Sequence, residues 1–279
     1  MRKQPTDHEI PVALSIAGSD SGGGAGIQAD LKTFHQFGVY GTSVITALTA
    51  QNTVGVSAIH TPPPEFVVEQ YRQVMTDIPV EATKTGMLAT APIINALAEV
   101  FEELPPINLV VDPVMISSTG ARLLEPEAER ALIERIIPLA DLVTPNLHEA
   151  AVLLGLASIS TLDKMREAAA GLAKLGPAAV LVKGGHLPTG DDGDEAIDIL
   201  FDGSTFTEFR APLLDQKDTH GTGCTLSAAI TAGLAQGRTV VEAVGAAKRF
   251  VTEAIRTAPG IGKGVGPLNH FVPVRPESD

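Results

Sequence analysis

The chain has 279 residues, 44% of them hydrophobic, which is enough for one large α/β domain or two small ones. Lys and Arg total 20 against 33 Asp and Glu, and the formal net charge of -13 argues against broad, non-specific binding to nucleic acid or to an anionic membrane. Any phosphate must therefore be held locally. The single cysteine cannot form an intrachain disulfide, and the N-terminus lacks the apolar core of a signal peptide, so we expect a cytoplasmic enzyme.

Short β-rich runs alternate with helical patterns along the whole chain. The patterns predict strands at 12–18, 42–51, 56–60, near Thr83, 107–114, 140–146 and 178–185, and an antiparallel hairpin over 196–212 that turns at Asp202 and Gly203. They predict helices at 27–38, 65–75, 92–101, near Glu149, 162–175, 222–235 and 240–258. The uncharged stretch 33–64 contains too many glycines and amides for a membrane span, and we expect it to be buried core.

This alternation predicts one doubly wound α/β/α domain over residues 12–274, preceded by an N-terminal tail at 1–11. In such folds ligands bind at the carboxyl ends of the strands.

A glycine-rich loop, "AGSDSGGGAGIQAD", follows the first predicted strand. Gly24, Gly26 and Ala29 satisfy the G-x-G-x-x-G/A pattern of dinucleotide sites, but nothing acidic lies between Asp30 and Glu65 to hold a ribose, which argues against NAD. The glycines are explained either by a tight turn with positive φ angles or by the close approach of a ligand.

A second loop, "THGTGC", opens the helical pattern at 222–235. The backbone N–H groups of Gly221, Thr222, Gly223 and Cys224 would be unpaired there, and with the helix dipole they would form an anion hole for a transferring phosphate. We expect the pKa of Cys224 to be lowered at this position, so that the thiol acts as a base toward a substrate hydroxyl. The alternative is a small core residue in an Ala-rich helix.

Seven stretches in order carry a resemblance: "AGSDSGGGAGIQADLKTF", "VITALTAQNT", "KTGML", "VVDPVM", "TPNLHEA", "VLVKGGH" and "THGTGCTLSAA". They resemble the hydroxymethylpyrimidine/phosphomethylpyrimidine kinases of thiamine biosynthesis, from Val12 to the "GKGVGPLNHF" tail. The resemblance implies a ribokinase-like three-layer α/β/α sandwich with a mostly parallel central sheet, and a homodimer is an expectation taken from the same family. It also implies ATP- and Mg²⁺-dependent phosphorylation of 4-amino-5-hydroxymethyl-2-methylpyrimidine, and then of the monophosphate to the diphosphate.

On the substrate side, the resemblance implies contacts from Gly18, Asp30, Gln51, Met87 and Val114. The Gln51 amide offers an acceptor and a donor, which suits an aminopyrimidine edge, although a polar strand end at this turn would look the same. Met87 and Val114 would form apolar walls, or plain core.

On the nucleotide side, the resemblance implies contacts from Asp112, Asn146, Lys183 and Thr219, with Glu149 and Asp112 toward a hydrated Mg²⁺. Asn146 and Glu149 also fit an ordinary capping box, and Lys183 fits an exposed lysine at a strand end. His186 and His220 lie near these loops, but no histidine pair has metal-ligand spacing, and we assign them no catalytic role.

Two departures separate this chain from related branches. Most superfamily members carry aspartate where Cys224 stands. A pyridoxal-phosphorylating branch has a second cysteine after the D-P-V-M motif, whereas this chain has Ser117 and Ser118 there. A pyridoxal or other vitamin kinase and a non-catalytic nucleotide- or pyrimidine-binding protein are the alternatives. We expect residues Ser117–Gly120 to form a flap over the site.

Overall fold

The computed structural model describes residues 9–115, 124–185, 187 and 195–274. The expected flap at 117–120, His186 and most of the N-terminal tail lie outside the described residues.

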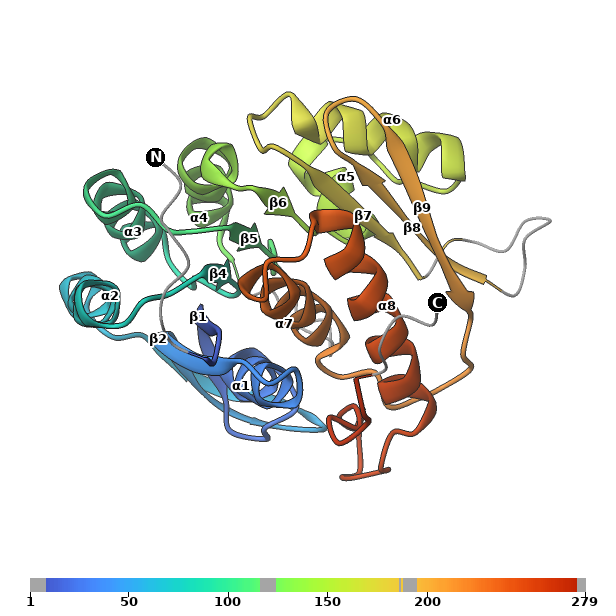
Figure 1. Ribbon diagram of the computed structural model, residues 1–279, viewed down its shortest axis with the longest axis horizontal. Helices are drawn as coiled ribbons and strands as arrows, with labels where there is room; N and C mark the ends of the chain where they lie inside the picture. Colours follow the sequence, from blue (N-terminus) through green and yellow to red (C-terminus); the bar gives the residue numbers. More distant parts are fainter. Residues whose placement is uncertain (1–8, 116–123, 186, 188–194, 275–279) are drawn as a thin grey trace.

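A nine-stranded sheet forms the centre of the described part of the chain, in the order β3-β2-β1-β4-β5-β6-β7-β8-β9 (Figure 1). Its members are β1 (Val12–Asp20), β2 (Tyr40–Asn52), β3 (Gly55–His60), β4 (Ala82–Thr85), β5 (Leu109–Val111), β6 (Leu142–Val143), β7 (Val180–Gly184), β8 (Glu195–Phe201) and β9 (Phe206–Pro212). The six central strands, in the sheet order β2-β1-β4-β5-β6-β7, pair in parallel. At the edges, β3 pairs antiparallel with β2, β8 with β7, and β9 with β8. The predicted mostly parallel sheet and the hairpin near Asp202 are therefore confirmed.

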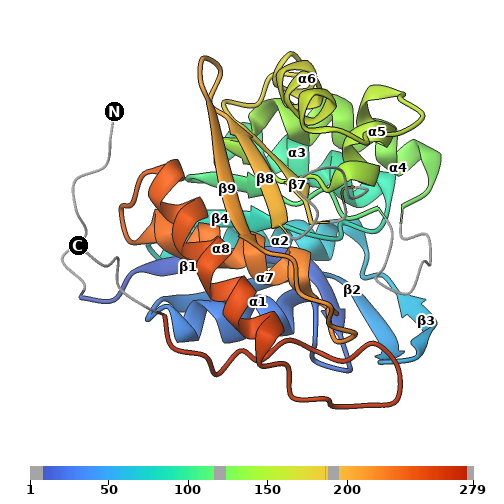
Figure 2. The ribbon, with the colours of Figure 1, turned by 90° about the vertical axis from the view of Figure 1, so that its right-hand side faces the viewer.

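Helices cover both faces of this sheet (Figures 1 and 2). One face carries α1 (Gly26–Gln36), α7 (Thr222–Ala235) and α8 (Val240–Arg256). The other carries α2 (Pro64–Asp77), α3 (Ala91–Glu103), α4 (Pro126–Ala131), α5 (Leu147–Leu154) and α6 (Leu162–Ala173). Side chains alternate along each strand, so Val110 of β5 packs toward α7 while Leu109 and Val111 pack in the opposite core. The predicted three-layer sandwich is confirmed.

One helical segment has no counterpart in the predicted pattern. After α4 the chain continues through a π turn (Leu132–Ile136) and a 3₁₀ turn (Ile137–Leu139). Pro126 begins this segment and Pro138 lies within its end, and proline is a usual signal of a helix boundary. Because α4 has only six residues and the π turn that follows interrupts the α-helical period, no regular apolar pattern stands out in this part of the sequence.

The prediction that residues 33–64 are buried core is wrong for their second half. Phe34, Val44 and Ala47 are buried, but Val54 and Ile59 are 68% and 46% exposed. Ile59 is exposed because β3 is an edge strand that pairs only with β2, and Val54 is exposed because it lies in the turn between these strands. Within the described residues, no helix has the length and apolar character needed to cross a membrane.

The parallel strands end at a common edge of the sheet, where the glycine loops and most of the predicted site residues follow them. β1 lies between β2 and β4. The connection through α1 leads from β1 to β2 on one face of the sheet, and the connection through α2 leads from β3 back past β1 to β4 on the other face. Ligands bind outside the carboxyl ends of strands at such a switch point. Topology therefore places the candidate site at this edge.

Candidate active site

The first glycine loop folds around the side chain of Asp20, the last residue of β1. Its Oδ1 accepts a hydrogen bond from the Gly22 N–H at 2.8 Å, and its Oδ2 accepts from Gly24 and Ala25 at 3.0 and 2.9 Å. Burial alone would raise the pKa of Asp20, but hydrogen bonds from His220 and from Ala25 and Gly22 lower it below its ordinary value. A carboxylate whose ionised form is favoured by these hydrogen bonds thus shapes the loop that enters α1.

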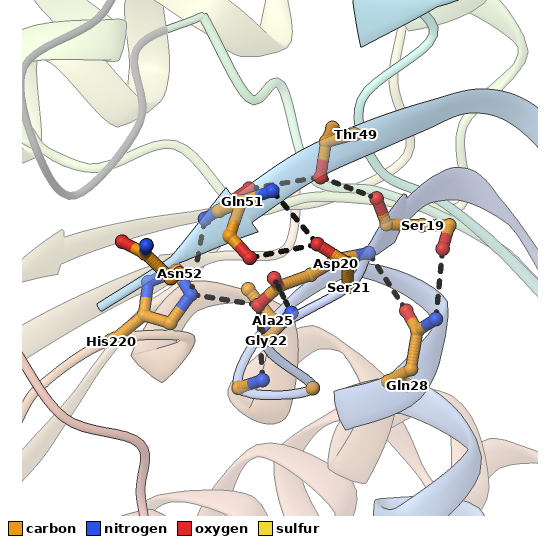
Figure 3. Close-up of polar contacts among 12 residues, drawn as sticks. Ser19, Asp20, Ser21, Gly22, Ala25, Gln28, Thr49, Gln51, Asn52 and His220 are labelled. Atoms are coloured by element: carbon orange, nitrogen blue, oxygen red, sulfur yellow. Dashed lines mark hydrogen bonds and ion pairs between the residues drawn. The ribbon is translucent and has the colours of Figure 1, made fainter. Parts of the chain in front are cut away.

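His220 joins this loop to the second glycine loop (Figure 3). Its Nε2 lies 2.9 Å from Asp20 Oδ2 and 3.3 Å from Gln51 Nε2. The two loops also touch through their backbones, because a Cβ on Gly221 would overlap the carbonyl oxygen of Gly24. Residues 200 positions apart in sequence therefore form one wall of the site.

Gln51 lies near the end of β2 and is held by both its backbone and its side chain. Ser21 Oγ accepts a hydrogen bond from the Gln51 N–H at 2.8 Å and donates to its carbonyl oxygen at 2.7 Å. A register shift against β3 falls between Ala50 and Gln51, and such irregularities re-aim side chains near sites. The Gln51 amide contacts Thr49 and His220. Its contact with a substrate stays a prediction.

Gly18 and Met87 face each other across the switch point. A Cβ on Gly18 would lie 2.5 Å from the terminal methyl group of Met87, so a larger residue at this point of β1 would require the flexible Met87 side chain to shift. The Met87 carbonyl is fixed by a 2.6 Å hydrogen bond from Thr46 Oγ1. Val114 is partly exposed, after the end of β5. An apolar wall from Met87 and Val114 agrees with this placement and stays a prediction.

Asp30 lies beneath the loop, in the interior of the protein. Its Oδ1 accepts a hydrogen bond from Lys84 Nζ at 2.8 Å, its Oδ2 accepts from Ser15 Oγ at 2.6 Å, and both charged side chains are 0% exposed. Burial raises the pKa of Asp30, while Lys84 and the hydrogen bonds oppose the rise. The carboxylate already has partners within the protein, and direct contact of Asp30 with a substrate stays a prediction.

The second glycine loop opens α7. Gly221 is the N-cap residue with φ of +85°, and no side chain among the described residues caps this helix. One detail of the predicted anion hole is wrong: the Thr222 N–H is not free but donates to the Thr219 carbonyl oxygen at 3.2 Å, and the Thr222 hydroxyl donates to the same atom at 2.8 Å. The tight turn at Thr219 takes up this N–H and leaves Gly221, Gly223 and Cys224 as the candidate donors to an anion.

The expected lowering of the Cys224 pKa is also wrong. Burial of the thiol raises its pKa to about 11, and the nearby carboxylates add to the rise. Lys84 and a hydrogen bond from the Gly26 N–H, at the start of α1, oppose the shift without reversing it. The thiol is therefore protonated at neutral pH, even though it lies in the first turn of one helix and against the first residue of another.

Asp112 and Lys183 form an ion pair beside the anion hole. Lys183 Nζ lies 3.0 Å from Asp112 Oδ1, and Asp112 Oδ2 accepts from Ser227 Oγ of α7 at 3.3 Å. A Cβ on Gly223 would lie 3.3 Å from Lys183 Nζ, so the ammonium group lies close to the first turn of α7. Burial opposes the charge on Lys183, but Asp112 and Glu149 raise its pKa, and it stays a cation.

Asn146 and Glu149 form the capping box of α5. The Glu149 N–H donates to Asn146 Oδ1 at 2.9 Å, and the Asn146 N–H donates to Glu149 Oε2 at 2.8 Å. Glu149 is only 4% exposed. Burial raises its pKa to about 7; Lys183 opposes this rise and Asp112 adds to it. The capping interpretation is confirmed, and the same carboxylate lies in the electrostatic field of the Asp112–Lys183 pair.

The structure thus brings the predicted residues into two groups on either side of the α7 N-terminus. Gly18, Gln51 and Met87 lie on the β1–β2 side, and the other group comprises Asp112, Asn146, Glu149 and Lys183. No role had been predicted for Asp20, His220 or Lys84 from the sequence. Lys84, a charged residue between the two threonines of the buried strand β4, was the available signal for a buried ion pair.

Solved structures with the same fold include several kinases. A Bacillus subtilis pyridoxal kinase, described in complex with ADP, is 40% identical with a TM-score of 0.86, covering 94% of this chain and 98% of that chain. A Clostridium difficile phosphomethylpyrimidine kinase is 46% identical with a TM-score of 0.78, covering 88% and 99%. Fold and site together define a kinase of the ribokinase-like superfamily.

Sequence comparison gives the family within that class. The model of the phosphomethylpyrimidine kinase family matches residues 20–269. The hydroxymethylpyrimidine/phosphomethylpyrimidine kinase of Rhizobium meliloti is 51% identical over 262 residues, covering 93% of this chain and 97% of the relative. A thiamine biosynthesis bifunctional protein of Geobacter sulfurreducens is 54% identical over 259 residues, covering 93% of this chain and 52% of that protein, so the chain spans about half the length of this bifunctional relative. The chain belongs to the phosphomethylpyrimidine kinase family.

Proposed function

We propose that this kinase transfers the γ-phosphoryl group of ATP to 4-amino-5-hydroxymethyl-2-methylpyrimidine, and then phosphorylates the resulting monophosphate to the diphosphate, in thiamine biosynthesis. The observation that carries the proposal is the α7 N-terminus. It has the Asp112–Lys183 ion pair on one side and the cluster of Asp20, His220 and Gln51 on the other. A phosphate held there would lie between a nucleotide and an alcohol.

Electrostatics support the position of the transferred group. The N–H groups of Gly221, Gly223 and Cys224 and the dipole of α7 would hold the phosphoryl oxygens, and Lys183 would compensate charge on the triphosphate. In a chain with a net charge of -13, this local concentration of donors is what allows a polyanion to bind.

Asp112 and Glu149 are the residues that would hold Mg²⁺. No group of three or more candidate metal ligands is found within the described residues. Proteins commonly hold Mg²⁺ through one or two carboxylates together with waters and substrate phosphates, and the buried carboxylates of Asp112 and Glu149 are donors of this kind. Magnesium would screen charge on the phosphates when bound. The raised pKa of Glu149, about 7, means that its carboxylate must lose a proton to serve as a ligand at neutral pH.

The two phosphorylation steps differ in whether they need a base, and therefore in how much they depend on the Cys224 thiol. Removal of a proton from the hydroxymethyl group in the first step would use a base, whereas the nucleophile of the second step is already an anion. With the pKa of its thiol raised to about 11, Cys224 is a weak candidate base before substrates bind, and its N–H is its firmer contribution. We propose that Cys224→Ala slows the first phosphorylation more than the second.

Pyridoxal is the second candidate substrate, because a pyridoxal kinase is among the solved structures with the highest structural similarity. The chain has one cysteine in all, and therefore lacks a second thiol for capturing an aldehyde. We expect pyridoxal turnover to be a side activity.

The test is to compare initial rates of ADP release with ATP, Mg²⁺ and either alcohol under identical conditions. We expect kcat/KM for the pyrimidine alcohol to exceed that for pyridoxal. A higher kcat/KM for pyridoxal would make pyridoxal the preferred substrate and contradict the proposal. If neither alcohol is turned over, both candidate substrates are wrong.

A further inference from the structure

Three segments of the chain meet at the side chain of Gln51 (Figure 3). The end of β1 contributes Asp20, the loop before α7 contributes His220, and β2 itself contributes Thr49. The Nε2 atom of His220 lies 2.9 Å from Asp20 Oδ2 and 3.3 Å from one end of the Gln51 amide. Thr49 Oγ1 lies 3.2 Å from the other end of that amide and 2.8 Å from the Ser19 carbonyl oxygen.

The proton on His220 is determined by Asp20. The Asp20 carboxylate already accepts N–H donors from Gly24 and Ala25 on the same Oδ2 atom, and it is held ionised by its hydrogen bonds. An ionised carboxylate only accepts hydrogen bonds. The His220 nitrogen that faces it at 2.9 Å must therefore carry a hydrogen, so Nε2 is a donor.

This proton determines the orientation of the Gln51 amide. A His220 Nε2–H cannot pair with an amide NH₂ group, and the single hydroxyl hydrogen of Thr49 is used by the Ser19 carbonyl. Both conflicts disappear when Gln51 Oε1 faces His220 and Gln51 Nε2 faces Thr49. Amide oxygen and nitrogen exchange places by a half-turn about the terminal bond, so no other atom moves.

We infer that His220, anchored by Asp20, is a positioning residue that fixes the Gln51 amide in this orientation. The single Nε2 hydrogen of His220 is then bifurcated between Asp20 Oδ2, at 2.9 Å, and Gln51 Oε1, which takes the 3.3 Å position. One Gln51 Nε2 hydrogen is used by Thr49, and by valence each end of the Gln51 amide keeps one further bonding position. The free pair presents an acceptor and a donor in a fixed order. This is the pattern that reads an amine next to a ring nitrogen on a heterocycle, so the inference rests on the proposed function.

His220 is itself held firmly enough for this role. Its backbone N–H donates to the Gly266 carbonyl oxygen at 3.1 Å, and a Cβ on Gly24 would overlap its ring. The residue is 7% exposed. A side chain fixed from its backbone, its ring face and its Nε2 atom can transmit orientation to Gln51.

The kinetic test compares His220→Ala with His220→Gln. Loss of the ring is expected to raise the KM for the pyrimidine alcohol by about tenfold, with kcat and the KM for ATP within about twofold of wild type. The amide NH₂ of His220→Gln can donate to both Asp20 and Gln51 and is expected to restore that KM to within about threefold. His35→Ala, on the exposed side of α1, is the matched control and should match wild type.

Other kinetic outcomes would overturn the inference. A fall in kcat at unchanged pyrimidine KM would assign His220 to the anion hole instead, and an absence of rescue by glutamine would make its role purely structural. If His220→Ala does not fold, Thr49→Val replaces it, since it removes the other anchor of the amide, and an unchanged pyrimidine KM in that variant would count against the inference.

A spectroscopic readout is independent of activity. Long-range ¹H–¹⁵N correlation spectra of the ring nitrogens, assigned to His220 by the signal that disappears in His220→Gln, are expected to show the Nε2–H tautomer. The Nδ1–H tautomer would overturn the inference even if the enzyme is fully active. If wild type shows no turnover of the pyrimidine alcohol, the proposed function fails, and the tautomer still decides the orientation of Gln51.

Discussion

Cys224 shows how two opposing effects act on one side chain. Its position in the first turn of α7 and its hydrogen bond from Gly26 favour the thiolate, while burial and neighbouring carboxylates favour the thiol. A helix N-terminus stabilises an anion by about 0.3–1 kcal/mol when exposed, less than a unit of pKa, whereas desolvation of a buried group shifts a pKa by several units. Burial therefore wins, and the pKa rises to about 11.

Alkylation measures this directly, because the chain has a single cysteine. We expect the iodoacetamide rate of the ligand-free protein, followed by mass spectrometry, to rise about tenfold per pH unit up to pH 10 without a plateau. The thiolate fraction increases as pH approaches the raised pKa, so the slope has a positive sign. If the alkylation rate reaches a plateau below pH 8.5, the pKa of Cys224 is lowered, as the sequence predicted, and not raised.

The buried ion pair of Lys84 and Asp30 contributes to the stability of the folded protein. Removing one partner leaves an uncompensated charge in the interior, so Lys84→Met is expected to reduce the free energy of unfolding by about 3–5 kcal/mol. Adding Asp30→Leu should recover part of that loss, because no charge is then left buried. Urea unfolding of the single and double variants checks this, and a loss below about 1 kcal/mol in the single variant would contradict it.

At the scale of elements, the ends of α7 differ in what their glycines do. Gly221 precedes the helix with φ of +85° and lies against the carbonyl of Gly24, whereas Gly237 follows it with φ of +80° and no atom near a Cβ. Both need the left-handed region, but only Gly221 also needs the space.

Alanine at these two positions separates conformation from contact. Gly237→Ala is expected to cost about 1 kcal/mol of stability and leave the initial rate within twofold of wild type. Gly221→Ala should cost more and lower kcat at least tenfold, because it pushes the glycine loops apart. Equal effects of both substitutions on kcat would show that contact between the loops does not matter for turnover.

Periodicity predicted most elements because their burial is regular. The β5 run "LVV" is apolar at every position since both faces are covered, and α3 and α8 show a clear helical period. The strand ends then indicated which residues share the active edge of the sheet. The Asp20–His220 contact was not predictable, because it depends on how two loops 200 positions apart orient their side chains. The prediction of a lowered Cys224 pKa was wrong for the same reason, because burial by segments that are distant in sequence leaves no signal in the residues around the cysteine.

At the scale of the whole molecule, the C-terminal segment after α8 links two loops of the candidate site through hydrogen bonds. The N–H groups of Lys263 and Gly264 donate to Thr53 Oγ1 at 3.1 Å, and the Gly266 N–H donates to Asp218 Oδ1 at 2.8 Å. The segment thereby connects the β2–β3 turn with the loop before α7. Further along, His270 Nε2 lies 3.0 Å from Thr225 Oγ1 of α7.

His270 makes this connection sensitive to pH. Burial lowers its pKa to about 4, against an ordinary value near 6.5, so the unfolded chain binds a proton that the folded protein excludes. Its contribution is present above about pH 6.5 and is lost as pH falls toward 4. Between pH 7 and pH 5, we expect wild type to lose about 2 kcal/mol more unfolding free energy than His270→Gln. Parallel urea titrations at both pH values check this, and equal losses would contradict it.

The central claim is that one site between Lys183 and Gln51 phosphorylates an alcohol and then its phosphate. The most direct measurement is a mass-spectrometric time course with ATP, Mg²⁺ and hydroxymethylpyrimidine. We expect the monophosphate to accumulate first and then to decay as the diphosphate forms. A reaction that stops at the monophosphate would contradict the two-step claim, and an unchanged alcohol would contradict the proposed function as a whole.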